Sequence, residues 1–404
     1  MEEQKSYQKK VLASSMLGLG LEGMDVLLLS FALSSIISEF HISSAAGGML
    51  PSITNIGMLL GGVLFGYMAD KHGRIKTFTY TIFIFAIATL LMAFAHSITE
   101  IYVLRFIVGL GAGGEYGIGM ALVAEVFPKN RRGQMSSWIT VGGQMGTLLA
   151  AIIAATIIPL AGWRGTFIFG ILPVILAYFV RRHLPETKAW QVTHKQELEN
   201  HQHPRLKILV KDPKTTGITI GLIIMSTVQI AGYYGLMNWL PSLLEKQQGL
   251  SVSGSSIWMI STIIGMSIGM LCFGKLLDRF GSKITYSAFL IMAAASISLY
   301  SLVHNSILML VVGMIVGFFA NGMNAGYGAL ISSFYPTEIR SFANNVIFNT
   351  GRAVGGLSPI LIGYLIDRSG FSAALLFLGS LYLISLVVVN LIPNPLGGKQ
   401  SIKN

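Results

Sequence analysis

Long apolar runs alternate with short polar segments along the whole chain. Each run is close to the roughly 20 residues that an α-helix needs to cross the hydrocarbon core of a bilayer. Backbone groups inside lipid must bond within the protein, and the short alternating strands of a barrel are absent, so the runs predict helices. We expect twelve membrane-spanning helices, over residues 11–37, 46–69, 77–95, 101–124, 134–158, 164–181, 215–240, 254–277, 284–303, 306–330, 341–366 and 372–392.

A polar segment between the second and third runs occurs twice. Gly66, Asp70 and Gly73 have identical residues 208 positions later, at Gly274, Asp278 and Gly281. The same offset relates four more pairs: Gly109 and Gly317, Pro128 and Pro336, Arg132 and Arg340, Gly162 and Gly370. A match at a fixed period predicts structural repeats. We therefore expect an all-α membrane protein with two six-helix bundles, at 1–181 and 215–404, joined by a polar linker at 182–214.

Composition supports a bilayer protein. Only 11% of the 404 residues are charged, whereas about 25% is usual for soluble domains. The net charge of +11 comes from basic residues in short connecting segments rather than on one face, so we expect no nucleic-acid partner.

Lys and Arg gather in every second connecting segment. The alternate segments hold only Arg164, Lys246 and Arg368. The positive-inside rule then places both termini in the cytoplasm, in a cytoplasmic (inner) membrane. Both copies of the Asp-Gly segment fall on that side, so the repeats run parallel, as in transporters with a site near the bilayer midplane.

Several motifs carry a family resemblance. Gly66-x-x-x-Asp70-x-x-Gly73-Arg74 and the Arg105–Gly113 segment resemble the signature motifs of the major facilitator superfamily. Four further segments resemble aromatic acid:proton symporters and nicotinate transporters: Glu22-Gly23-Met24-Asp25, Gly113-Gly114-Glu115, the stretch from Tyr234 to Pro241, and Tyr335–Arg340. The resemblance implies alternating-access symport of protons with a small organic anion, such as nicotinate or benzoate.

Other functions stay open. The Leu184-Pro185-Glu186-Thr187 segment is similar to an element of sugar porters. The same element occurs in related organic-ion carriers. Within the superfamily, the alternatives are a proton-coupled sugar carrier and a drug or cation exporter. A channel or receptor without alternating access is the alternative from another class.

Ionisable residues inside the spans are candidates for proton coupling, because such groups are costly in a bilayer. Glu22 and Asp25 share one face of the first helix, and Arg105 lies at a similar depth in the fourth. Burial favours a protonated carboxyl and a nearby Arg favours a charged one. We expect Asp25 to pair with Arg105 and to load and release the proton, with Glu115 as a second candidate. A structural ion pair is the alternative for each.

Polar and aromatic residues of later helices are candidates for substrate binding. Arg352 offers a planar fork of donors that suits a carboxylate, and its counterpart in the first repeat is Gln144. Asn345 and Asn349 share its helical stripe, with interhelical hydrogen bonding as the alternative. The remaining candidates are Tyr234, Asn238, Trp239, Asn324 and Tyr327; for Trp239 a place at the membrane interface is the alternative.

The repeated loop implies a gate. By resemblance, Asp70 and Arg74, with Glu125 of the fourth helix, hold the two halves together at the cytoplasmic side. Asp278 and Arg279 form a weaker copy, because Ser282 and Ser333 stand where Arg74 and Glu125 stand in the first repeat.

The sequence shows no nucleophile–base pair, metal set or phosphate-binding motif. We therefore expect no enzyme, metal or cofactor. The expected partners are the organic anion, protons and the lipid bilayer, and we expect a monomer.

Overall fold

The computed structural model describes residues 2–42, 44–168, 172, 175, 184–199, 206–248, 252–300, 303 and 305–393. Within some helices the backbone is described but certain side chains are not, those of Asn238 and Trp239 among them. All the regular structure of the described residues is helical.

The chain forms two compact units. The first contains Met1–Pro128, Trp138–Ile208 and Tyr335–Asn349, and the second contains Lys129–Ser137, Leu209–Phe334 and Thr350–Asn404. The division of the chain at 1–181, 182–214 and 215–404 stays a prediction.

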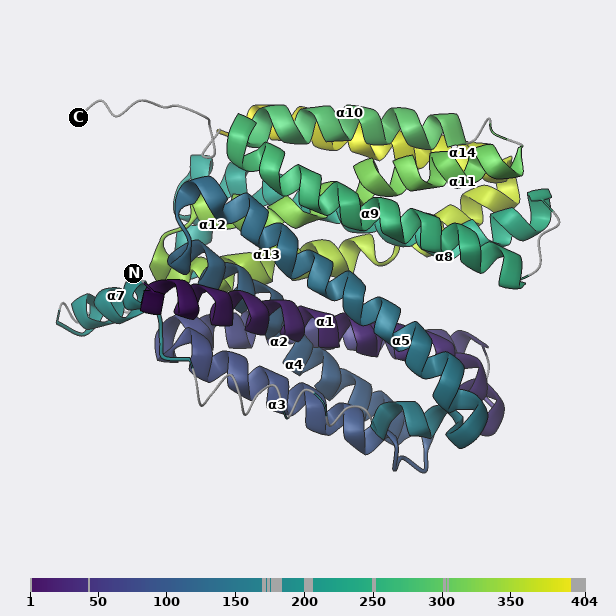
Figure 1. The fold of residues 1–404 in the computed structure, drawn as a ribbon, viewed down its shortest axis with the longest axis horizontal. Helices are drawn as coiled ribbons and strands as arrows, with labels where there is room; N and C mark the ends of the chain where they lie inside the picture. The colour runs from purple at the N-terminus through teal and green to yellow at the C-terminus, as the bar shows by residue number, and fades with distance from the viewer. Residues whose placement is uncertain are drawn as a thin grey trace. The chain divides into compact units, whose positions relative to one another are not determined.

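The helices of the first unit follow the apolar runs of the sequence. Figure 1 shows α1 to α4 alongside one another, with α7 beyond the start of α1. The helices are α1 (Glu2–Glu39), α2 (Ser44–His72), α3 (Arg74–Met92), α4 (Ile98–Val126), most of α5 (Arg132–Ile168), α7 (Lys188–Glu199), the short η6 (Thr337–Ile339) and the first part of α13 (Arg340–Gly355). Glycines allow α2 and α4 to approach closely: a Cβ added at Gly113 would lie 2.1 Å from the Met58 carbonyl oxygen.

The second unit contains the later helices. In it α14 packs against both α8 and α10, and α9 packs against α11. Its elements are η1 (Lys129–Arg131), η3 (Leu206–Val210, partly), α8 (Pro213–Gln248), α9 (Val252–Phe280), α10 (Ser282–Tyr300), α11 (Ser306–Val316), η4 (Gly317–Asn321), η5 (Met323–Gly326), α12 (Tyr327–Phe334) and α14 (Ser358–Leu391).

Ten helices among the described residues are long and apolar enough to cross a membrane. Two expected spans are missing from this set. The first, 164–181, falls largely outside the described residues. The second, expected at 341–366, is divided by a turn, because α13 ends at Gly355 and α14 begins at Ser358. Gly355 and Gly356 are poor helix formers, and Pro359 suits the first turn of a new helix.

Backbone geometry confirms the internal repeat. Among the described residues, four glycines have positive φ: Gly73 (115°), Gly162 (64°), Gly281 (80°) and Gly370 (80°). They form two pairs at the 208-residue offset. Gly162 and Gly370 each interrupt a long helix, α5 and α14 respectively. Two chain segments of different sequence therefore bend at equivalent positions.

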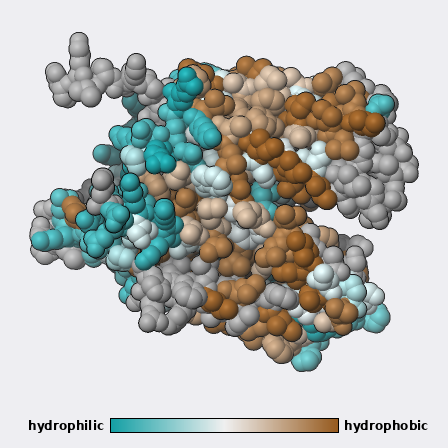
Figure 2. Space-filling view, viewed as in Figure 1, coloured by the Kyte–Doolittle hydropathy of each residue, from teal (hydrophilic) through white to brown (hydrophobic). Residues whose placement is uncertain are grey.

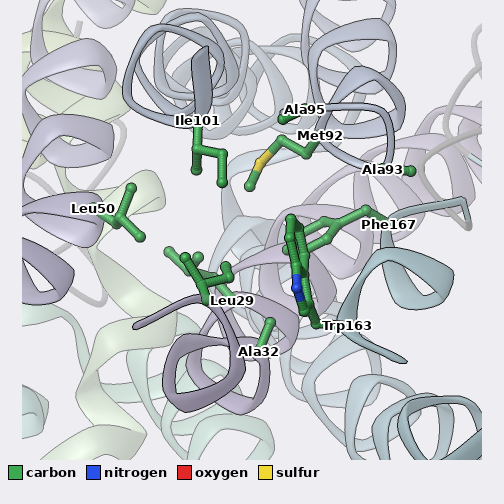
Figure 3. Close-up of a cluster of buried hydrophobic side chains, with 10 residues drawn as sticks. Leu29, Ala32, Leu50, Met92, Ala93, Ala95, Ile101, Trp163 and Phe167 are labelled. Carbon is green, nitrogen blue, oxygen red and sulfur yellow. The ribbon is translucent and has the colours of Figure 1, made fainter. Parts of the chain in front are cut away.

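A cluster of buried apolar side chains holds one end of the first unit together. Figure 3 shows Trp163 and Phe167 of α5 facing Met92 and Leu29. The Trp163 indole N–H donates to Glu39 Oε2 at 2.7 Å, and Arg164 Nη1 lies 2.5 Å from Glu39 Oε1. The end of α1 is thus tied to α5 by a carboxylate beside an apolar core.

The flanks of the helices are apolar, as lipid contact requires. Figure 2 shows hydrophobic residues along the helix flanks and hydrophilic residues near the start of α1 and α7. Large side chains such as Val103 and Ile152 are more than half exposed. A surface of this kind faces a bilayer.

The Glu39 contacts predict a pH-dependent stability. The hydrogen bond from the Trp163 indole, followed by that from Arg164, lowers the pKa of Glu39. A lowered carboxyl pKa stabilises the folded protein above the unfolded value of about 4.3, and this stability is lost as the pH falls through the folded value. We expect Glu39→Gln to destabilise the protein at neutral pH by about 0.2–1 kcal/mol, the range for exposed pairs.

Thermal unfolding in detergent across a pH series measures this effect. The difference from wild type should close in acid, and Glu3→Gln, at an exposed position of α1, serves as the control. Equal melting temperatures for wild type and Glu39→Gln at every pH would contradict the prediction.

Candidate functional site

A buried ion pair joins α1 to α4 in the first unit. Arg105 Nη1 lies 2.9 Å from Asp25 Oδ2, and both side chains are at most 2% exposed. Thr89 donates its hydroxyl to Asp25 Oδ1 at 3.2 Å, and Arg105 Nε donates to the Thr54 hydroxyl at 3.1 Å. The expected pairing of Asp25 with Arg105 is confirmed.

Two further acids lie near this pair. Glu22 on α1 is 5% exposed and Glu115 on α4 is 3% exposed. Glu22 and Asp25 are close enough to Glu115 to act on it electrostatically. Neither carboxyl oxygen of Glu115 has a hydrogen-bond partner among the described residues. The structure therefore gathers all four predicted proton-coupling residues in one interior region.

Asp70 binds the start of α13. Its two carboxylate oxygens accept from Ser341 N at 3.1 Å and Phe342 N at 2.9 Å. The first N–H groups of a helix have no partner within the helix, and its N-terminus favours negative charge. Arg74 Nη2, 2.9 Å from Asp70 Oδ1, balances that charge.

Arg74 is the centre of a wider network in the first unit. Its guanidinium donates to Glu125 Oε1 at 3.1 Å, to the Ala69 carbonyl at 2.9 Å and to the Thr337 carbonyl. Arg74 is fully buried, so each of these acceptors stabilises an otherwise costly charge. The three predicted gate residues of the first repeat thus lie together.

The segment before α7 completes this network. Sequence reasoning missed the part that this segment plays. The Glu186 carboxylate accepts from Ile75 N at 3.1 Å and Lys76 N at 2.9 Å, so it caps the start of α3. Thr187 donates to Glu125, and the Trp190 indole donates to the Asp70 carbonyl at 2.8 Å. The only sequence signal for these contacts is the Pro-Glu-Thr pattern, which in the sequence indicates a subfamily rather than a structural role.

Gly73 is required for this arrangement on two grounds. Its φ of 115° is one that L-residues rarely adopt, and a Cβ there would lie 2.4 Å from Glu186 Oε1. As a glycine before α3 it has no side chain to cap the helix. Glu186 supplies that cap from a position 111 residues away in the chain.

Asp278 repeats the Asp70 contact inside the second unit. Its carboxylate accepts from Gly133 N at 2.7 Å and Gln134 N at 2.8 Å, at the start of α5. These residues correspond to Ser341 and Phe342 by the 208-residue offset. In both copies of the motif, the Asp therefore binds two N–H groups at the start of a helix. Arg279, by contrast, is exposed and lies over the Phe280 ring.

Asn345 and Asn349 bind the backbone of α4. Asn345 accepts from Gly117 N at 2.7 Å and donates to the Gly114 carbonyl at 3.2 Å, and Asn349 donates to the Gly113 carbonyl at 2.8 Å. Both are at most 1% exposed. In this conformation they make interhelical hydrogen bonds, which was the alternative to substrate binding.

The helix expected at 306–330 is not continuous. After α11 the chain forms a π-helical turn, η4, and a 3₁₀ turn, η5, before α12. Gln229 of α8 donates to the Ala320 carbonyl at 3.0 Å and to Asn321 Oδ1 at 2.9 Å. Such irregular turns are frequent at functional sites.

Gln229 is a candidate that sequence reasoning missed. It is 1% exposed, and its Oε1 has no hydrogen-bond partner in the described part of the chain. Oδ1 of the half-buried Asn324 also has no hydrogen-bond partner among the described residues. The second unit thus places two amide oxygens beside an irregular helix.

The other predicted substrate residues come from α5, α8, α12 and α13. Tyr327 is buried and donates to the Met225 carbonyl at 2.8 Å, while Tyr234 packs edge-on against Tyr233. Arg352 lies half-buried near the end of α13. Gln144 belongs to the first unit and is half-buried on α5. The side chains of the other two candidates, Asn238 and Trp239, lie outside the described residues.

The chain matches a protein-family model. The family model described as the Major Facilitator Superfamily matches residues 15–269 and 222–403. Together these ranges cover nearly the whole chain.

Curated relatives match over most of their length. A "putative metabolite transport protein" of Haemophilus influenzae is 40% identical over 400 residues, which cover 98% of each chain. The cis,cis-muconate transport protein of Acinetobacter baylyi is 31% identical over 92% of this chain and 91% of its own. The niacin transporter NiaP of the same organism is 29% identical over 88% of this chain and 87% of its own.

A solved structure shares the fold. The proton:xylose symporter XylE, solved with 6-bromo-6-deoxy-D-glucose, matches with a TM-score of 0.79 over 97% of both chains at 18% identity. The expected all-α fold is thereby confirmed.

The buried pair predicts a coupled pattern of stability. Asp25→Ala leaves Arg105 without its carboxylate, and losing one partner of a buried pair costs about 3–5 kcal/mol. The double variant Asp25→Ala/Arg105→Met removes both charges and should recover much of that loss. Thermal unfolding of four proteins in one detergent measures it: wild type, Asp25→Ala, Arg105→Met and the double variant. If the double variant is as unstable as the sum of its single variants, the two residues are not coupled.

Proposed function

Because this chain belongs to the Major Facilitator Superfamily and is a secondary transporter, we propose that it carries a small organic anion together with protons. The substrate is an aromatic or heteroaromatic carboxylate of the nicotinate or benzoate type. The names of two relatives support a carboxylate, since muconate and niacin are both carboxylic acids, and niacin also carries a heteroaromatic ring.

The proposal depends most on the acid cluster of α1 and α4. Ionisable groups inside a membrane are costly and mark ion and proton pathways. Here Glu22, Asp25 and Glu115 share one interior region, and Asp25 is paired with Arg105. An anion that enters with one proton crosses without net charge, so the proton gradient drives its uptake.

The second unit offers groups that suit a carboxylate on a ring. Arg352 has a planar donor fork for the carboxylate. Tyr233 and Tyr234 supply aromatic faces, and the amide groups of Gln229 and Asn324 supply polar contacts. Apolar walls with a few polar groups are typical of small-molecule sites.

Transport proceeds by alternating access of the predicted bundles 1–181 and 215–404. Asp70 bonded to α13 and Asp278 bonded to α5 connect residues of one bundle to residues of the other. These contacts break when the bundles separate on that side. The basic connecting segments place that side, and both termini, in the cytoplasm.

A ligand screen followed by transport assays tests the function. Thermal shifts of the purified protein are measured with nicotinate, benzoate, cis,cis-muconate, xylose and a quaternary ammonium ion; a ligand at about 100 times its Kd adds roughly 2.7 kcal/mol. We expect a carboxylate to stabilise the protein and to show counterflow in proteoliposomes. Stabilisation by xylose or the cation alone would favour a sugar carrier or an exporter, and absence of counterflow would favour a channel.

The role of Arg352 is tested by a charge-preserving change. Arg352→Lys keeps the cation but loses the bidentate fork, so the Kd of the best carboxylate ligand should rise about tenfold, the equivalent of about 1.4 kcal/mol. Arg368→Lys, on an exposed side chain that bonds Tyr364, is the control. An unchanged Kd for Arg352→Lys would exclude it as the carboxylate ligand.

The role of Asp70 is tested by separating binding from transport. Asp70→Asn weakens the charged contacts with α13, each typically worth about 1.5–3 kcal/mol, so the rate of uptake should fall roughly tenfold. The Kd should stay at the wild-type value, because Asp70 lies in the last turn of α2 and bonds the start of α13 rather than a ligand. Asp278→Asn, the same change at the counterpart in the second repeat, should likewise lower the uptake rate and leave the Kd unchanged. Loss of binding with a normal uptake rate would contradict the assignment of Asp70 to the gate.

A further inference from the structure

A polar stripe follows the contact between α1 and α4. Ser15, Gly18, Glu22 and Asp25 are spaced by three or four residues, so they share one face of α1. On α4, a Cβ at Gly119 would lie 3.5 Å from Ser15 Cβ. The stripe therefore extends from the Asp25–Arg105 pair at one end to Ser15 at the other.

Glu115 lies in the middle of this stripe. A Cβ added at Gly18 would be 3.4 Å from Glu115 Oε2, so the glycine leaves the room that the carboxyl occupies. The side chain is 3% exposed, and no donor among the described residues reaches either oxygen. Ser15, next along the stripe, also has a buried hydroxyl without a partner there.

Both carboxylate oxygens of Asp25 have bonding partners, whereas those of Glu115 have none among the described residues. One Asp25 oxygen bonds Arg105 and the other accepts from Thr89, so its negative charge is balanced. A carboxylate without donors has no such compensation when it leaves water, and it takes up a proton instead. The charged groups that act on Glu115 are Glu22 and Asp25 of α1, which add repulsion. Arg105 lies ten residues earlier on α4 and is bonded to Asp25.

We infer that Glu115, rather than Asp25, carries the proton that is transported with the substrate. The carboxylate takes up a proton from water when its region is hydrated, and it is held as a neutral acid in the conformation seen here, in which it is buried. The Asp25–Arg105 pair stays intact and keeps its charges balanced. This inference rests on the proposed proton symport.

Infrared spectroscopy of the reconstituted protein tests the proton on Glu115 without a substrate. A protonated carboxyl has a carbonyl stretching band that an ionised one lacks. We expect Glu115→Gln to remove one such band at neutral pH, and Asp25→Asn and Glu22→Gln to retain it. A band that persists in Glu115→Gln and disappears in Asp25→Asn would overturn the inference.

Transport of radiolabelled nicotinate, benzoate and cis,cis-muconate into proteoliposomes tests the coupling. With one proton per anion, an inward gradient of one pH unit supports roughly tenfold accumulation. Glu115→Gln resembles the protonated form and cannot release a proton. Its accumulation ratio should therefore fall to about one, while counterflow at equal pH persists and shows that the variant is folded. Glu115→Asp should restore part of the accumulation.

The transport results distinguish a wrong assignment of Glu115 from a wrong proposed function. If Glu115→Gln accumulates the anion as wild type does, Glu115 is not the proton carrier. If wild type itself accumulates none of the three anions under the gradient, the proposed function is wrong. The infrared result then still decides whether Glu115 holds the proton in this conformation.

Discussion

A charge removed from water has to be balanced inside the protein, and this requirement determines the buried contacts of the first unit. Isolated charges in a low dielectric are costly, whereas bonded pairs are tolerated. Arg105 is matched by Asp25, and the fully buried Arg74 is matched by Asp70 and Glu125. Glu115 is the buried acid that lacks such a partner among the described residues, and so its charge has to change when its surroundings change.

The second constraint is the unbonded N–H groups at helix starts. Three carboxylates accept from them: Asp70 at α13, Asp278 at α5 and Glu186 at α3. Each acceptor comes from a distant part of the sequence, so a local turn is stabilised by a tertiary contact. Because these contacts form at helix ends, breaking them frees helices to move without disturbing the apolar packing of the spans.

The sequence predicted the features that leave a periodic or charged signal. The spans follow from hydropathy, and the 208-residue offset anticipated the paired positive-φ glycines, Gly73 with Gly281 and Gly162 with Gly370. The Asp25–Arg105 pair followed from depth along two helices. In each case, spacing along the chain was enough.

Other features depend on contacts that no single segment reveals. In the sequence, Gln229 is one polar residue in an apolar run. Only the structure shows that it donates to a carbonyl of η4. The amides of Asn345 and Asn349 could have faced a ligand, yet they meet the glycine-rich backbone of α4, which only the packing decides. The break after Gly355 was missed because apolar residues continue on both sides of it.

The exchange of caps between repeats has a consequence for biosynthesis. Asp278 is translated 145 residues after Gly133, whose N–H it accepts. While the ribosome makes that intervening chain, the start of α5 remains without its carboxylate and depends on water or lipid headgroups. The amino-terminal half therefore reaches its final form only after α9 enters the membrane, so a nascent chain stopped before that point is an incomplete protein and a target for quality control.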